Sequence, residues 1–216
     1  MRFGFGLVLM LVGASAWAQQ SAATAVVTFT FEWAGIDVPK YSLTLGEDGR
    51  GHYSATEVGR RGVEYAPQTV ESDVQISAAR TAAVFAAARE LKRFDFACAS
   101  TLKGVASSGA KTLAYAGPDG AGKCAFDYAD DKRVMMLTSF FLGVAMTLDE
   151  GRVLEFDRRF DPLGLDKEIS VFTGLVKEGN ALEVGNIAPV LRRIAGDSGV
   201  FERVRVKAAD LLADKR

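Results

Sequence analysis

The sequence predicts an α+β fold: an antiparallel sheet made of a meander and a hairpin with packed helices, followed by an all-helical C-terminal region. Two observations carry this prediction. Before residue 147, apolar residues alternate with polar ones in short segments, which is typical of half-buried strands. Beyond it, apolar residues recur only at helical spacing. We therefore expect an α+β domain at 19–146 and a helical region at 147–216 packed on it.

The meander is expected to contain the first four strands. Residues 46–49, Gly-Glu-Asp-Gly, form a turn signal between the second and third of them. Residues 56–68 show no alternation and are expected to form an irregular loop. The expected strands are residues 26–33, 41–45, 50–55 and 70–76.

A helix, a loop and a hairpin should follow the meander. An alanine-rich segment has its apolar residues at helical spacing, and a turn signal at 117–120 separates two further alternating segments. The expected boundaries are a helix cap at Ser77, a helix end near Phe94, strands at 111–116 and 123–129, and a helix from Asp130 to about Ala145.

Four helices are expected in the C-terminal region. Thr147-Leu148-Asp149-Glu150 has the form of a capping box, which predicts a helix start there and an end before Pro162. The other expected boundaries are caps at Asp166 and Asn186, a stop at Gly179, and a last helix at 200–213. No Pro-, Gly- or Ser-rich linker separates the two regions, so we expect them to pack together.

The first 18 residues have the pattern of an export signal. Arg2 supplies a positive charge, residues 3–12 are apolar, and Ala16-Trp17-Ala18 fits the small-residue cleavage rule. We expect a periplasmic or secreted protein cleaved after about Ala18. A retained membrane helix is the alternative, but roughly 20 apolar residues are needed to span a bilayer. No later segment is expected to span one.

Export to an oxidising compartment predicts a disulfide between Cys98 and Cys124, the only two cysteines of the chain. It would join the hairpin to the end of the preceding helix. A redox-active or nucleophilic thiol is the alternative. No Cys-x-x-Cys motif and no nearby histidine supports it.

Composition excludes several classes of function. The net charge of −1 gives no electrostatic field for nucleic acid. With one histidine and two cysteines, the chain has no set of ligands for a histidine- or cysteine-rich metal site. Carboxylates occur in clusters, but none has the spacing of a calcium loop, and interleaved arginines and lysines favour solvated helix faces. We assign no metal and no cofactor.

A glycine-rich segment, Gly117-Pro-Asp-Gly-Ala-Gly122-Lys123-Cys124, is close to a phosphate-binding loop. Cys124 stands where that motif needs a Ser or Thr hydroxyl for magnesium. The motif must also open a helix, whereas residues 125–129 have the pattern of a strand. A hairpin turn is therefore the favoured interpretation.

Residues near the C-terminus resemble one HEAT-type helical repeat. Pro189 and Leu191 match the first helix of such a repeat, and Val204-Arg205, Ala208 and Leu211 match the second. The resemblance covers residues 187–213. It implies a helical hairpin and suggests protein binding. Because such repeats normally need about three copies to bury a core, a single one should dock on the preceding helices.

The expected binding residues lie in the first half of the chain. Arg60, Arg61 and Tyr65 fall in the predicted loop, and Arg and Tyr are enriched at binding hot spots. His52, the single histidine, is expected on a strand and is either a surface residue or a general base.

These features favour a non-catalytic binding or envelope-associated protein, with another envelope or extracellular protein as its partner. No catalytic residue is assigned, because the sequence holds no nucleophile elbow and no cofactor fingerprint. The alternative is a hydrolase that uses a carboxylate pair, or Ser107 or Ser108 with His52. A third option is a structural component of a larger assembly. A deep polar cleft with shifted pKa values would favour the enzyme, and an exposed groove with Arg61 or Tyr65 the binding protein.

Overall fold

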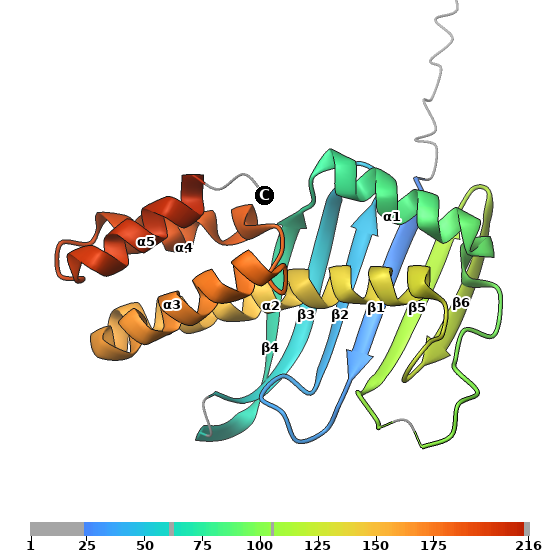
Figure 1. Ribbon diagram of the computed structural model, residues 1–216, viewed down its shortest axis with the longest axis horizontal. Helices are drawn as coiled ribbons and strands as arrows, with labels where there is room; N and C mark the ends of the chain where they lie inside the picture. Colours follow the sequence, from blue (N-terminus) through green and yellow to red (C-terminus); the bar gives the residue numbers. More distant parts are fainter. Residues whose placement is uncertain (1–23, 61–62, 105, 214–216) are drawn as a thin grey trace, which may run out of the picture.

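The computed structural model describes residues 24–60, 63–104 and 106–213, so the expected export signal lies outside the described residues. Six antiparallel strands form one sheet in the order β4-β3-β2-β1-β5-β6 (Figure 1). The strands are β1 Val26–Glu32, β2 Lys40–Gly46, β3 Arg50–Arg60, β4 Val63–Gln75, β5 Ala110–Gly117 and β6 Gly120–Phe126. The predicted α+β sheet of a meander and a hairpin is therefore confirmed.

The sheet buries one of its two faces. In β1, Val27, Phe29 and Phe31 are buried, whereas Thr28 and Thr30 lie on the opposite face and are half-buried. Helices α1 (Ala78–Glu90) and α2 (Lys132–Phe160) cross the buried face (Figure 1). Strict alternation in the sequence thus separates core from surface, as a strand with a period of two residues requires.

The expected loop at 56–68 is wrong. Strand β3 extends into this segment as far as Arg60, and β4 begins within it at Val63; the two strands pair with each other, with a register shift between Glu57 and Gly59. Alternation does persist, because Ala55, Glu57 and Gly59 are all buried. A charged residue and a glycine at core-facing positions hid this pattern in the sequence.

The expected helix start at Thr147 is also wrong. Helix α2 runs without a break for 29 residues, Lys132–Phe160, and its N-cap is Asp131, one residue beyond the predicted cap. Thr147 is fully buried, and its hydroxyl donates to the carbonyl of Leu182 at 2.7 Å instead of capping a helix. The two predicted regions therefore share one continuous helix.

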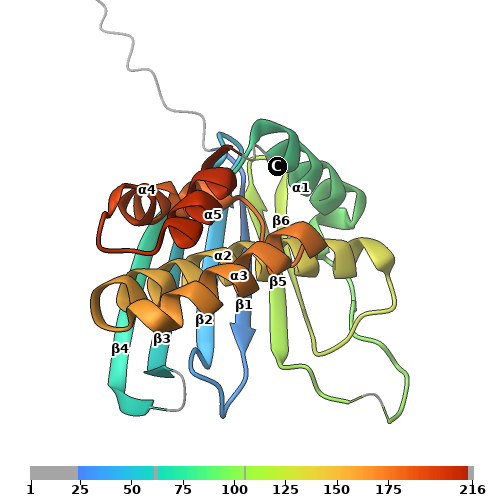
Figure 2. The same ribbon diagram turned by 60° about the vertical axis from the view of Figure 1, so that its left-hand side comes forward.

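Beyond the sheet, α2 packs against a second group of helices (Figures 1 and 2). These are α3 Pro162–Glu178, the 3-10 turn η2 Val184–Ile187, α4 Ala188–Gly196 and α5 Glu202–Ala213. A second apolar core contains Leu154 of α2 together with buried residues such as Phe172, Leu191 and Val204. The molecule thus has two cores, joined by α2.

Two expected helix caps in this region are wrong. Asp161, not Asp166, is the N-cap of α3, and its side chain accepts from the backbone of Gly164 at 2.9 Å. Asp166 instead binds Arg203 of α5. Gly179 does end α3 in a left-handed conformation, at φ 76°. Asn186 caps no helix, since the N-cap position of α4 is Ile187.

Asn186 joins the C-terminal region to the sheet. Its amide pairs with the backbone of Gln75 in β4, accepting from the N–H at 2.7 Å and donating to the C=O at 3.1 Å. Glu183 accepts from the backbone and hydroxyl of Ser77. Ser77 precedes α1 as predicted, but its hydroxyl makes this long-range contact and no cap bond.

The hairpin β5–β6 carries the predicted disulfide. Cys98 and Cys124 are bonded, with their Cα atoms 5.8 Å apart. The glycine-rich segment forms the hairpin turn, with Gly120 at φ 135°, and leads into β6 and not into a helix. The hairpin-turn interpretation of this segment is confirmed.

Helix α2 is long and apolar enough, by length and composition, to cross a membrane, so the expectation that no segment after residue 18 has these properties is wrong. In the fold, 61% of its most apolar 18-residue window is buried inside the protein. The buried apolar side chains of α2 contact the sheet core and the C-terminal helices, whereas Met136, Phe156 and Phe160 are exposed.

Gly151 permits the close approach of α2 and η2. A methyl group at this position would overlap the side chain of Ile187. We expect Gly151→Ala to lower the free energy of unfolding by about 1–3 kcal/mol, measured by urea denaturation. Gly174 lies in α3 with open space around it. Its replacement by Ala should stabilise the protein by about 0.5–1 kcal/mol, and equal effects at both positions would contradict the close-packing argument.

Candidate functional site

A chain of polar side chains crosses the boundary between the two cores. The hydroxyl of Tyr53 donates to Asp149 Oδ1 at 2.7 Å, and Arg152 Nη2 lies 2.9 Å from the same oxygen. Arg152 Nε lies 3.8 Å from Glu57, which accepts two hydrogen bonds from Arg60 at 2.9 and 3.1 Å. We call Tyr53, Asp149, Arg152, Glu57 and Arg60 the charged network.

The fold positions this network from both sides. Tyr53 and Glu57 project from the buried face of β3, and Arg60 ends that strand. Asp149 and Arg152 lie on α2 at the point where its apolar contacts change from the sheet to the C-terminal helices. Neither apolar core closes over this point, so charged groups can sit here with partners and partial access to solvent.

Partial burial shifts the ionisation of the network. Burial raises the pKa of Asp149, although the charge of Arg152 and the hydrogen bond from Tyr53 act in the opposite direction. Burial and the charge of Asp149 raise the pKa of the Tyr53 hydroxyl. For Arg152, burial favours the neutral form, but Asp149, Tyr53 and Glu57 outweigh it and raise the pKa. Arg152 therefore stays charged beside the cavities that it lines.

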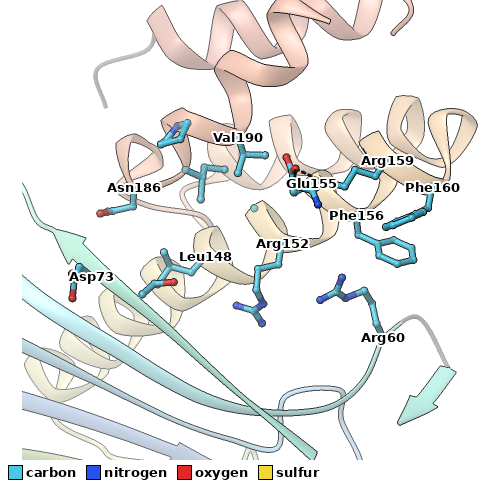
Figure 3. Close-up of a pocket in the computed structure, with 14 residues that line it drawn as sticks. Arg60, Asp73, Leu148, Arg152, Glu155, Phe156, Arg159, Phe160, Asn186 and Val190 are labelled. Atoms are coloured by element: carbon cyan, nitrogen blue, oxygen red, sulfur yellow. Dashed lines mark hydrogen bonds and ion pairs between the residues drawn. The ribbon is translucent and has the colours of Figure 1, made fainter. Parts of the chain in front are cut away.

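The first cavity has a volume of about 610 Å³ and lies between β4, the second half of α2 and the start of α4 (Figure 3). Arg60 and Arg152 point into the space between the helix and the strands (Figure 3). The apolar part of its lining consists of Leu148, Phe156, Phe160, Ile187, Pro189 and Val190. This volume lies in the range of small-molecule sites, roughly 300–1,000 Å³.

A second cavity of about 460 Å³ shares Arg60 and Arg152 with the first. Its aromatic side chains are Phe31, Trp33 and Tyr41. Glu57 and Asp149, the two carboxylates of the network, line this cavity and not the first. The network is therefore polarised: its arginines face both cavities, and its carboxylates face only the second.

The structure brings two of the predicted binding residues together. Arg60 and Tyr65 line a third cavity of about 420 Å³ with Phe156. Burial and the neighbouring carboxylate of Glu57 raise the pKa of Tyr65 to about 12. Arg61 lies outside the described residues. His52 is exposed on the sheet face opposite Tyr53, where its Nδ1 lies 3.1 Å from Asp73.

The proposed pair of a serine with His52 is not assembled. His52 is level with Thr28 of β1 through β2, whereas β5 begins at Ala110, which is level with Glu32. Four residues along a strand correspond to roughly 13 Å, and three strand spacings add about 14 Å sideways. Ser108, just before β5, instead binds Asp127.

The predicted carboxylate clusters form no metal site among the described residues: no three His, Cys, Asp or Glu side chains there could hold an ion. Several of these carboxylates instead form ion pairs with arginine side chains. Glu155 accepts from Arg158, Arg159 and Arg193. Burial opposes its ionisation, but these hydrogen bonds outweigh burial and lower its pKa to about 2.

Sequence reasoning missed the central residues of the site. The clustered carboxylates and the arginines between them were expected on solvated helix faces, yet Asp149 contacts Tyr53 and Arg152 contacts Glu57 beneath α2. A signal for this was present, because the two residues are three apart and lie next to Leu148 and Gly151 on the apolar stripe. Glu57 carried no such signal without its partners.

Comparison of this chain with protein-family models and with curated proteins gives no match to either. The function must therefore be argued from the site.

Proposed function

We propose that this protein is an exported, non-catalytic binding protein and that the first cavity is its ligand site. The observation that carries the proposal is the composition of this cavity. Two guanidinium groups, from Arg60 and Arg152, face a wall of apolar side chains in one concave space. Apolar pockets with a few convergent polar groups are the usual form of small-molecule sites.

The disulfide supports export. Cys98 and Cys124 are bonded and buried, and such bonds persist mainly in oxidising compartments. Export is also supported by the pattern of the first 18 residues. The partner that the sequence suggested, another envelope or extracellular protein, could deliver or receive the ligand of the cavity.

The hydrolase alternative receives less support from the geometry. Its carboxylate pair would be Glu57 and Asp149, which line the second cavity. A general acid or base needs a carboxylate oxygen within reach of substrate. Asp149 Oδ1 already accepts from Tyr53 and Arg152, and Glu57 Oε1 accepts twice from Arg60. Because these oxygens already accept hydrogen bonds within the protein, the two carboxylates are better suited to a fixed structural role than to proton transfer with a substrate.

Filling the cavity should weaken binding. Val190 lines it from α4, and we expect Val190→Trp to weaken binding of a small amphiphile by about tenfold or more. Calorimetry with three single-chain probes, decanoate, decanol and decylammonium, measures this without assuming a headgroup. Val206→Trp is the control, because Val206 is 51% exposed on α5 and lines none of the three cavities described above.

Binding of any of the probes that Val190→Trp weakens and Val206→Trp retains would support the proposal. If no probe binds, or if Val190→Trp binds like the wild type, the first cavity is not the ligand site.

A further inference from the structure

We infer that the outer edge of β4 is the docking site of a partner protein, which adds to the sheet an extended segment of alternating basic and apolar residues. This inference goes beyond the proposed function, because it concerns a protein partner and needs no small ligand in the first cavity. Three features carry it: the outward backbone groups of β4, the acidic side chains on one side of this edge, and the apolar lining of the first cavity on the other.

Strand β4 is an edge of the sheet, with backbone groups turned outward (Figure 1). Gln75 shows which groups these are, because its N–H and C=O turn away from β3 and bind the side chain of Asn186. Outward and inward residues alternate along an antiparallel strand, so Thr69, Glu71 and Asp73 also turn their N–H and C=O groups outward. On this side the backbone of these three residues bonds to no residue that the structure describes.

The unpaired part of the edge is bounded at both ends. Asn186 covers it at Gln75, and Pro67, which has no N–H to donate, lies at the other end. Unpaired backbone groups at a sheet edge are a ready template for another chain. Addition of a strand to such an edge is a recurring mode of peptide recognition. Residues 69–73 therefore suit a short extended segment.

The side of this edge that faces away from the helices is acidic. Glu71 and Asp73 are both exposed there, and residues 67–75 include no lysine or arginine. His52 lies 3.1 Å from Asp73 and leaves its side chain 97% exposed. A residue paired directly with either acid projects from the same face of the sheet, where opposite charges are favourable and like charges are not. We therefore expect basic residues of the partner at these two positions.

The other side of the edge faces the first cavity. Ser72 lines this cavity, and its pairing partner in β3 is the buried Tyr53, so Ser72 lies on the helix side of the sheet. In an added strand, the residues that alternate with the basic ones project from this same side. They would meet an apolar lining that includes Phe156 and Val190. We therefore expect apolar residues of the partner at the alternate positions.

A second copy of this chain is a poor occupant of the same edge. Antiparallel pairing about a two-fold axis at Glu71 would place the two Glu71 side chains opposite each other, which is unfavourable. An axis one residue further along would pair Glu71 with Asp73. An axis one residue earlier would bring Pro67, which has no N–H, into the pairing. The edge therefore suits a chain of opposite charge.

A fluorescently labelled heptapeptide, Val-Lys-Val-Lys-Val-Thr-Val, tests the docking directly. Paired antiparallel, it places its lysines opposite Asp73 and Glu71, its threonine opposite Thr69, and its valines on the cavity side. In an NMR titration we expect the largest shifts at the backbone amides of these three β4 residues. N-methylation of the two lysine nitrogens keeps every side chain but removes two N–H donors, so it should weaken binding about tenfold or more in fluorescence polarisation.

Charge reversal at the edge separates the proposed contact from general electrostatics. We expect Glu71→Lys to weaken binding of the lysine peptide roughly three- to tenfold and to strengthen binding of the matching glutamate peptide, Val-Glu-Val-Glu-Val-Thr-Val. Asp210→Lys is the matched control, because Asp210 is exposed on α5 and its replacement changes the net charge equally. This variant should bind both peptides like the wild type.

Thermal unfolding of each variant checks that the protein is folded. If Glu71→Lys does not fold, the comparison is made with Glu71→Gln, which should weaken binding of the lysine peptide roughly twofold or more. Binding of this peptide at wild-type affinity by the folded variant would overturn the role of Glu71.

The remaining outcomes also decide the inference. Equal binding of the lysine peptide and its N-methylated form, or no binding of the lysine peptide, overturns strand addition at β4. Equal weakening by Glu71→Lys and Asp210→Lys reduces the effect to net charge and overturns it too. A dimer in analytical ultracentrifugation that Thr69→Pro dissociates would assign the edge to a second copy. None of these measurements uses the amphiphile probes, so failure here and failure of the proposed function are distinguishable.

Discussion

Replacing Asp149 by alanine is expected to lower the free energy of unfolding by about 2–3 kcal/mol, less than the removal of one partner of a fully buried ion pair, because the side chains of Arg152 and Asp149 are 20% and 27% exposed. Asp149 Oδ1 accepts from both Tyr53 and Arg152. Its loss leaves the Tyr53 hydroxyl without this acceptor and the Arg152 guanidinium with only the distant Glu57. Urea denaturation at neutral pH measures the effect.

Two further variants separate charge from hydrogen bonding. Because burial raises the pKa of Asp149, its folded-state pKa lies above the unfolded one, so this group alone stabilises the protein as the pH falls through that interval. The neutral Asp149→Asn, which keeps an acceptor oxygen, should therefore lower stability much less than alanine does. Tyr53→Phe removes one hydrogen bond to a charged group and should lower stability by about 1.5–3 kcal/mol.

A loss below about 1 kcal/mol for Asp149→Ala, within the range of an exposed ion pair, would contradict the structural role of the network. Equal losses for alanine and asparagine would show that the negative charge matters more than the hydrogen bonds. In either case the circular dichroism of each variant, compared with that of the wild type, establishes that the fold is retained.

Removing the disulfide should lower the free energy of unfolding by about 3–4 kcal/mol. Cys98 and Cys124 are 26 residues apart, and the bond limits the freedom of this loop in the unfolded chain. Both residues are buried, so the double alanine variant avoids placing new hydroxyl groups in the core. Urea denaturation of this variant, beside the wild type with and without reductant, measures the contribution.

Reduction should bring the wild type close to the double variant and leave the double variant unchanged. Mass spectrometry of the native protein after thiol labelling provides an independent check. Two labelled thiols in the native protein would contradict the bond and weaken the case for export.

The sequence was most informative where a single period governed a segment. The alternation around Phe29 and the turn before Gly120 predicted strands and hairpin, and Gly179 predicted the end of α3. It was misleading where a residue type has two uses. Thr147 fits a capping box in sequence, but it donates to Leu182 inside α2. Asn186 is a common cap residue, but here it pairs with the backbone of Gln75.

The amino-acid pattern by itself determined the α+β class, the pairing of the two cysteines and the buried face of the sheet. The period of the apolar residues is visible within each short segment, and a chain with only two cysteines can form only one disulfide. Only the tertiary structure decided which charged side chains lie next to one another. Glu57 and Asp149 are 92 residues apart in the chain, and each looks like an ordinary surface acid. They share Arg152 because α2 continues past the sheet edge and crosses β3, a contact that no local pattern encodes. The candidate site arises from that crossing.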